Sequence, residues 1–209
     1  MNSSAAAIDK HRLAGLQDGV YSIAMTLLVL ELKLPGMPEH VTDAMLWHAL
    51  IGIWPKLLTW FLSFWVLAVF WIGDARALGS FSLVNRFLLR LSLWRLALVS
   101  LLPFSTAFIG EHGDHVPSAA LYAGHLVLLA SVQTIRHLYV RARPSIVPAH
   151  ELAHLSEAGP HAYVTLACAS AALALAFFVP GYNMLALLPV LFVQVFRTFR
   201  SRSQRTEAA

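Results

Sequence analysis

Charged residues are scarce in this chain. Of its 209 residues, 12% are charged and 58% are hydrophobic, and the mean hydropathy is +0.65. Soluble domains contain about 25% charged and 45–50% apolar residues. The composition therefore predicts an integral membrane protein. The net charge of +4 comes from arginines that interrupt apolar runs and form no basic patch, so no nucleic-acid partner is expected.

Cysteine and the motifs of several enzyme classes are also missing. The single cysteine, Cys168, lies inside an apolar run, which excludes an intrachain disulfide and a cysteine-ligated metal centre. The chain contains no His-Glu-x-x-His motif, no Gly-x-Ser-x-Gly motif and no pair of acids within an apolar run. We therefore expect no enzyme activity and no metal site. The first twelve residues lack the pattern of a cleaved signal peptide.

Long apolar runs fill most of the sequence. A membrane-spanning helix needs roughly 20 apolar residues. This length predicts six spans, at about residues 13–34, 48–73, 83–110, 118–140, 161–180 and 182–199. The connections are too short for a further domain. The expected fold is one all-α membrane domain over residues 1–209, with flexible tails at 1–11 and 201–209.

Lysine and arginine are unevenly distributed between the two predicted membrane faces. The first and third connections hold only Lys33 and Lys56, together with five acidic residues. The other face carries Lys10, Arg12, Arg76, Arg86, Arg136, Arg141, Arg143, Arg197, Arg200, Arg202 and Arg205. The positive-inside rule then places both termini in the cytoplasm, in a multi-pass protein of the cell inner membrane. The acidic outer face either reflects this rule alone or concentrates cations at a pore mouth.

The first span contains an aspartate, Asp18. Carboxylates inside a membrane span are costly and are usually paired or functional. Arg12 lies six residues earlier, about 120° around the helix, which favours a partner on another helix or subunit. Arg12 of a neighbouring copy, Arg90 and Arg95 are candidates, and solvation of Asp18 at the interface is the alternative. Arg95 itself lies about two turns deep in the third span, where a charge needs a partner or a water-filled cavity, and Asp18 and Asp74 are the acids on that side.

Apolar residues form a stripe along the same helix. Ile23, Thr26, Leu27 and Leu30 follow the spacing i, i+3, i+4, i+7. Asp18 precedes Ile23 by five residues, about 140° around the helix, so it points elsewhere. By periodicity alone, such a stripe is typical of ordinary packing in a helix bundle.

The residues Arg12-x-x-x-Leu16-Gln17-Asp18 begin an apolar helix that ends in a proline. This segment resembles the first helix of the transmembrane protein 175 potassium-channel family, whose signature is Arg-x-x-x-Phe-Ser-Asp. Arg12 and Asp18 match the signature, whereas Leu16 and Gln17 replace its Phe and Ser.

Two later segments support the resemblance. Residues 62–71 are similar to the second helix of that family, although the histidine usual after its tryptophan is absent, with Gly73 and Asp74 nearby. Residues 101–110 are similar to a Pro-Phe-x-Thr segment in its third helix. The resemblance extends over about 130 residues, from the first helix into the fourth.

The resemblance implies a six-helix subunit that assembles as a homotetramer in the lipid bilayer, with the first helix lining a central pore for K⁺. The stripe of Ile23, Thr26, Leu27 and Leu30 would then face the permeation path, with Ile23 as the narrowest ring and Thr26 as a contributor to selectivity. The helical phase does not decide between Thr26 and Leu27, which lie on either side of the stripe's mean direction. Rings of apolar side chains gate by dewetting. Asp18 would join Arg12 in a network that holds the first helices in register. Such channels lack a Gly-Tyr-Gly filter and need no cofactor besides the permeant ions.

Other functions remain open on the sequence alone. His125 and His137 lie in one span, twelve residues or about 18 Å apart, which is too far for one metal but compatible with two haem planes. A secondary transporter would be expected to contain inverted repeats, yet residues 118–199 hold no second copy of the Arg12–Asp18 motif. Proton flux through the same pore is a further alternative that the sequence does not separate from K⁺ flux.

Overall fold

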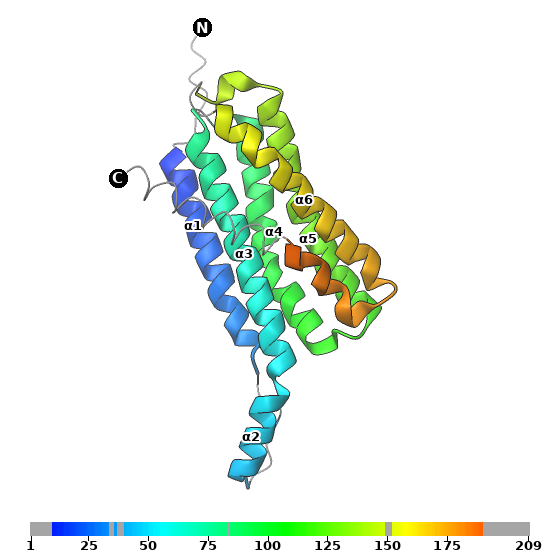
Figure 1. Cartoon of the computed structure of the whole chain (residues 1–209). Coiled ribbons are helices and arrows are strands. Elements are labelled where there is room, and N and C mark those ends of the chain that lie inside the picture. Colours follow the sequence, from blue (N-terminus) through cyan, green and yellow to red (C-terminus); the bar gives the residue numbers. More distant parts are fainter. Residues whose placement is uncertain (1–9, 34–35, 37–39, 83, 149–151, 190–209) are drawn as a thin grey trace, which may run out of the picture.

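A computed structural model describes residues 10–33, 36, 40–82, 84–148 and 152–189 of the chain, with side chains of α6 from Pro160 onward. Helices account for almost all of these residues (Figure 1). Their bounds are α1 Lys10–Leu27, η1 Leu28–Glu31, α2 Asp43–Gly52, α3 Trp54–Ser80, α4 Arg86–His112, α5 Val116–Arg141, η2 Pro144–Ile146, α6 Leu152–Ala176 and η4 Pro180–Leu187.

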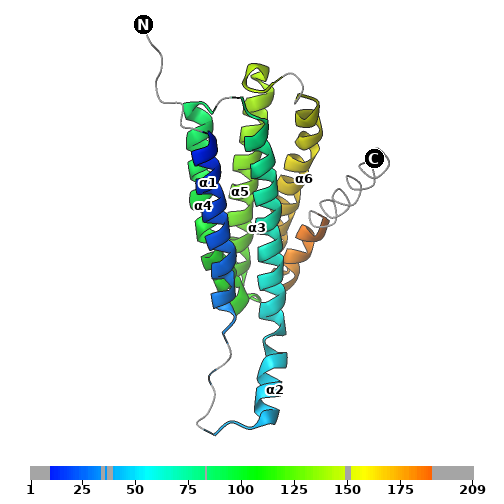
Figure 2. The same cartoon turned by 90° about the vertical axis from the view of Figure 1, so that its left-hand side faces the viewer.

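Four helices of the described chain are long and apolar enough to cross a membrane: α1 together with η1, α3, α4 and α5. They form a bundle in which α1 contacts α3 and α4, and α4 contacts α5. Helix α6 packs along α5, and α2 extends the line of α3 beyond the end of the bundle (Figure 2). Leu67, Val99, Leu102 and Leu129 are fully buried at the centre.

The first four predicted spans each correspond to one of the four long apolar helices, although the second is divided, and the last two differ from the structure. The fifth predicted span ends earlier, since α6 stops at Ala176 and its apolar part is the shorter segment Pro160–Ala176. Of the sixth, residues 182–187 belong to the 3₁₀ helix η4, and residues 190–199 lie outside the described residues. The chain is thus a multi-pass, all-helical membrane protein, and the count of six spans stays a prediction.

The second predicted span, 48–73, is divided in the structure. Helix α2 begins after Thr42, whose side chain accepts a hydrogen bond from the Met45 amide at 3.4 Å. The helix is interrupted at Ile53, and α3 begins at Trp54 with Pro55 in its first turn. Proline is tolerated there because the first amides of a helix have no intrahelical partner. Apolar residues continue through the break, so the apolar run in the sequence predicts a single span here.

The start of α1 is attached to the end of α3. Lys10 Nζ donates hydrogen bonds to the carbonyl oxygens of Gly79, at 2.6 Å, and Phe81, at 2.9 Å. Unpaired carbonyls at the end of a helix attract cations. The last two residues of the tail predicted for 1–11 thus belong to helix α1. Residues 1–9 and the predicted tail 201–209 lie outside the described residues.

Candidate functional site

Helix α1 has one face buried in the bundle and a wide face that no other described segment of the chain covers. The buried positions are Leu13, Gln17, Tyr21, Ala24 and Leu28, which repeat every three or four residues. The opposite face carries the predicted stripe, with Ile23 60%, Leu27 40% and Leu30 61% exposed. The stripe thus points away from the core of the chain. Within the described chain, it is not the packing face.

At the C-terminal end of the stripe the backbone is wound more tightly than the α-helix that the sequence periodicity predicts. The α-helix ends at Leu27, and Leu28–Glu31 continues as the 3₁₀ helix η1. Residues three apart lie in line in a 3₁₀ helix. Leu27 and Leu30 therefore point in nearly the same direction, and the stripe remains continuous through the change of helix type.

Thr26 is the one hydroxyl residue of the stripe, and its side chain is exposed. Its Oγ1 lies 3.0 Å from the Ser22 carbonyl oxygen and 2.9 Å from that of Ile23, so the hydroxyl hydrogen is directed at its own helix. The lone pairs of a hydroxyl that donates in this way remain free to accept. Thr26 therefore presents an acceptor, not a donor, on the exposed face of α1.

The motif residues of the first helix occupy different environments. Asp18 Oδ1 accepts a hydrogen bond of 2.8 Å from the Trp71 indole Nε1 on α3. Gln17 is buried, whereas Arg12 and Leu16 are exposed. Both ion pairs among the described residues involve the carboxylate of Asp74, not that of Asp18. The network of Asp18 with Arg12 of a neighbouring copy therefore stays a prediction.

The Trp71–Asp18 bond supports a first prediction. In Trp71→Phe the carboxylate loses its indole donor, and we expect the free energy of unfolding to fall by about 1 kcal/mol, the net value of one hydrogen bond. Thermal unfolding of the purified protein in detergent measures the change. Trp94→Phe, at an exposed position of α4, controls for the loss of an indole and should leave the midpoint unaltered. Equal effects of the two substitutions would contradict the prediction.

A second polar cluster lies inside the bundle, around the Asp74 carboxylate. Arg95 Nε lies 2.5 Å from Oδ2, Arg136 Nη2 lies 2.7 Å from Oδ1, and the Tyr21 hydroxyl donates to Oδ2 at 2.6 Å. Each of the four residues is at least nine-tenths buried. We call this group the Asp74 node. It joins α1, α3, α4 and α5 at a single point.

The structure shows that Arg95 pairs with one of its two candidate acids. It also brings to this carboxylate two residues, Arg136 and Tyr21, that the sequence does not single out as partners. Arg95 pairs with Asp74, not with Asp18. Arg136 belongs to the charges that the positive-inside rule uses to predict orientation, but in the structure it is buried and paired. Its position more than one turn before the end of α5 is a signal that it faces the bundle. Tyr21 follows Asp18 by three residues, and nothing in the apolar pattern distinguishes it.

The two histidines of α5 have no metal-binding geometry among the described residues, where no group of three His, Cys, Asp or Glu side chains comes together. His125 uses both ring nitrogens within the bundle. Nδ1 lies 2.9 Å from Ser105 Oγ, and Nε2 lies 2.9 Å from the Leu98 carbonyl oxygen. The ring thus links α4 to α5.

The stripe and the motif of α1 both lie within a segment of the chain that matches a known family. Residues 12–103 match the family model described as the endosomal/lysosomal potassium channel TMEM175. Over these residues the chain matches the TMEM175 family. The resemblance predicted from the first helix is therefore confirmed. Because this is a family of ion channels, the expectation that the chain is not an enzyme is confirmed as well.

Individual TMEM175 relatives are similar over part of the chain, and one solved structure over nearly all of it. A potassium channel of Streptomyces collinus is 33% identical over 57% of this chain and 58% of its own length. A potassium channel of Chamaesiphon minutus is 36% identical over 58% of this chain and 61% of its own length. The crystal structure of a lysosomal potassium-selective channel TMEM175 homolog from Chamaesiphon minutus aligns with a TM-score of 0.75 and 25% identity, covering 92% of this chain and 97% of that one.

These alignments reach less than two thirds of the length of the curated relatives. The family match, residues 12–103, begins with the Arg12 motif and ends within α4. It thus contains the stripe and three residues of the Asp74 node, Tyr21, Asp74 and Arg95, and it stops short of Arg136.

Proposed function

We propose that this chain is the subunit of a potassium channel in which α1 lines the permeation path. The observation that carries the proposal is the outward-facing stripe of Ile23, Thr26, Leu27 and Leu30 on the helix that bears the family motif. The names of the relatives, which are potassium channels, support the same function. The channel conducts K⁺ with a modest preference over Na⁺.

The position of α1 at the side of the bundle favours an oligomeric pore. A stripe that faces away from its own subunit can enclose a path only when several copies bring their stripes together. We infer a homotetramer of six-span subunits in the lipid bilayer, with both termini on the cytoplasmic side of the inner membrane. Closed rotational symmetry is the usual arrangement of identical subunits.

The conduction mechanism follows from the chemistry of the stripe. An apolar ring offers no oxygen to replace the hydration shell of a cation, so a narrow ring of isoleucine or leucine loses its water and blocks the ion. A slight widening readmits water and opens the path. Ile23 forms the narrowest ring in this proposal, with Leu27 and Leu30 beyond it. Thr26 supplies the acceptor oxygen next to the constriction and contributes to selectivity.

The test is ion flux into proteoliposomes for the unmodified protein and Ile23→Asn. An asparagine ring keeps water in the constriction, so we expect K⁺ flux to rise severalfold and the preference for K⁺ over Na⁺ to fall. N-methylglucamine in place of K⁺ gives the background. Ile135→Asn, an exposed isoleucine of α5, is the matched control and should behave as the unmodified protein.

Two outcomes would contradict the proposal. Folded protein without K⁺ flux in either form would remove the channel function and return the stripe to packing. An identical rise in Ile23→Asn and Ile135→Asn would show a leak through damaged bilayer instead of a gate. A pH-sensitive dye inside the same vesicles separates K⁺ flux from proton flux.

A further inference from the structure

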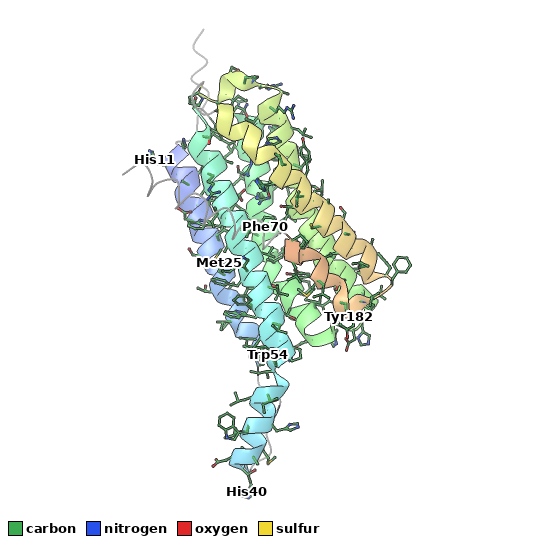
Figure 3. The ribbon with its side chains drawn as sticks, in the orientation of Figure 1. His11, Met25, His40, Trp54, Phe70 and Tyr182 are labelled. Carbon is green, nitrogen blue, oxygen red and sulfur yellow. The ribbon has the colours of Figure 1, made fainter. Side chains whose placement is uncertain are left out.

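The Asp74 node contains an anchor that does not depend on α1. Arg95 Nη1 donates to the Leu129 carbonyl oxygen at 2.6 Å. Arg95 Cζ lies 4.9 Å from the centre of the ring of Phe70, the α3 residue labelled in Figure 3. Arg136 holds the other carboxylate oxygen of Asp74 from α5. Helices α3, α4 and α5 thus hold the carboxylate from three sides.

Helix α1 reaches this anchor through one group, the Tyr21 hydroxyl. Two residues of α-helix correspond to about 200°, so Tyr21 and Ile23 lie on opposite sides of α1. Their burial agrees with this geometry, since Tyr21 is 1% and Ile23 60% exposed. The hydrogen bond from Tyr21 to Asp74 therefore lies directly behind the proposed constriction. A rotation of α1 that turns Ile23 away must break it.

Charge makes this bond stronger than an ordinary tyrosine contact. Two guanidinium groups surround one carboxylate, which keeps Asp74 ionised. Hydrogen bonds to an ionised acceptor are shorter and stronger than those between neutral groups. The hydrogen bond from Trp71 to Asp18, which also joins α1 to α3, lies at an exposed position and is weaker for that reason.

We propose that Tyr21 and Asp74 are positioning residues of the channel: the Asp74 node sets the rotation of α1 about its axis and so aims the ring of Ile23 at the permeation path. Neither side chain touches the path. The inference rests on the proposed channel function, but the rotation itself can be measured without ion flux. Ion preference then depends on a phenolic oxygen behind the pore helix.

The experiment removes that oxygen alone. In Tyr21→Phe, we expect a shift in the equilibrium between α1 with Ile23 facing the path and α1 rotated so that Ile23 faces away. The equilibrium constant changes by roughly tenfold, the scale of one hydrogen bond to a charged acceptor. Because Cys168 is the single cysteine, a Cys168→Ser background allows Ser22→Cys and Ile23→Cys to be introduced one at a time. A membrane-impermeant methanethiosulfonate reagent labels each in membranes. We expect the ratio of the two labelling rates to change by roughly tenfold in Tyr21→Phe, together with a lower K⁺/Na⁺ permeability ratio.

Tyr122→Phe is the matched control. The Tyr122 hydroxyl is fully buried and lies 2.9 Å from Ser63 Oγ, so its loss removes a buried bond between α5 and α3 that does not involve α1. We expect it to alter neither the labelling ratio nor the ion preference. A labelling ratio unchanged in Tyr21→Phe, or changed equally in Tyr122→Phe, would overturn the inference. If neither the unmodified protein nor Ile23→Asn conducts, the channel proposal fails separately, and the labelling ratio still decides whether the node sets the rotation.

Discussion

Replacing Asp74 with asparagine is expected to lower the free energy of unfolding by about 3–5 kcal/mol, the cost of leaving a buried charge without its partner. The substitution preserves the shape of the side chain and can still accept from Tyr21. It leaves Arg95 and Arg136, both buried, without a carboxylate. We expect Asp74→Asn to reduce the yield of folded protein far more than Trp71→Phe does.

The asymmetry of the node sharpens this prediction. Two guanidinium groups share one carboxylate, so Arg136→Met leaves a balanced pair of Arg95 and Asp74. We therefore expect Arg136→Met to be much less destabilising than Asp74→Asn. Thermal unfolding in detergent and monodispersity on size exclusion measure both. Asp43→Asn, at an exposed site in the first turn of α2, serves as the control. Equal damage by Arg136→Met and Asp74→Asn would show that shape, not charge, holds the node together.

The second large effect is expected where α6 meets α5. Small residues line the inner face of α6, since Ala162, Thr165, Ala169, Ala172 and Ala176 are all buried. Helices in membranes approach closely along such faces, because no side chain separates their backbones. Ala172→Leu inserts three carbon atoms into this contact. Overpacking of a core costs roughly 1–3 kcal/mol, so we expect a lower unfolding midpoint and, in part of the protein, a detached α6.

The neighbouring residue provides the control for this substitution. Ala171 lies on the exposed face of α6, and Ala171→Leu adds the same atoms without meeting α5. The midpoint of Ala171→Leu should match that of the unmodified protein. If the two leucine variants unfold at the same temperature, the α5–α6 contact is looser than the burial of Ala172 indicates. Either result is read from the same thermal unfolding curves.

The spans illustrate which features of the fold can be predicted from composition. Apolar runs of about 20 residues place α1, α3, α4 and α5 because the thickness of the bilayer sets the length of a span. The boundary at Ile53 was not predicted, since α2 and α3 are both apolar and only the local backbone separates them. The shorter apolar part of α6 was likewise not apparent from hydropathy.

The sequence by itself determined the membrane class, the resemblance to the TMEM175 family and the face of α1 that carries the stripe. These properties follow from local quantities: the length of an apolar run, the 3.6-residue period and a motif confined to residues 12–18. Ile23, Leu27 and Leu30 could be selected in this way because they share one helix and one face.

Only the tertiary structure decided how the buried charges pair. Asp74 meets Tyr21, Arg95 and Arg136, which lie 53, 21 and 62 positions away along the chain. Periodicity within one helix reports which face is buried, but it does not report the rotation and height of that helix relative to its neighbours. The choice between Asp18 and Asp74 for Arg95 depended on those two quantities. So did the placing of Tyr21 behind Ile23 and against the Asp74 carboxylate.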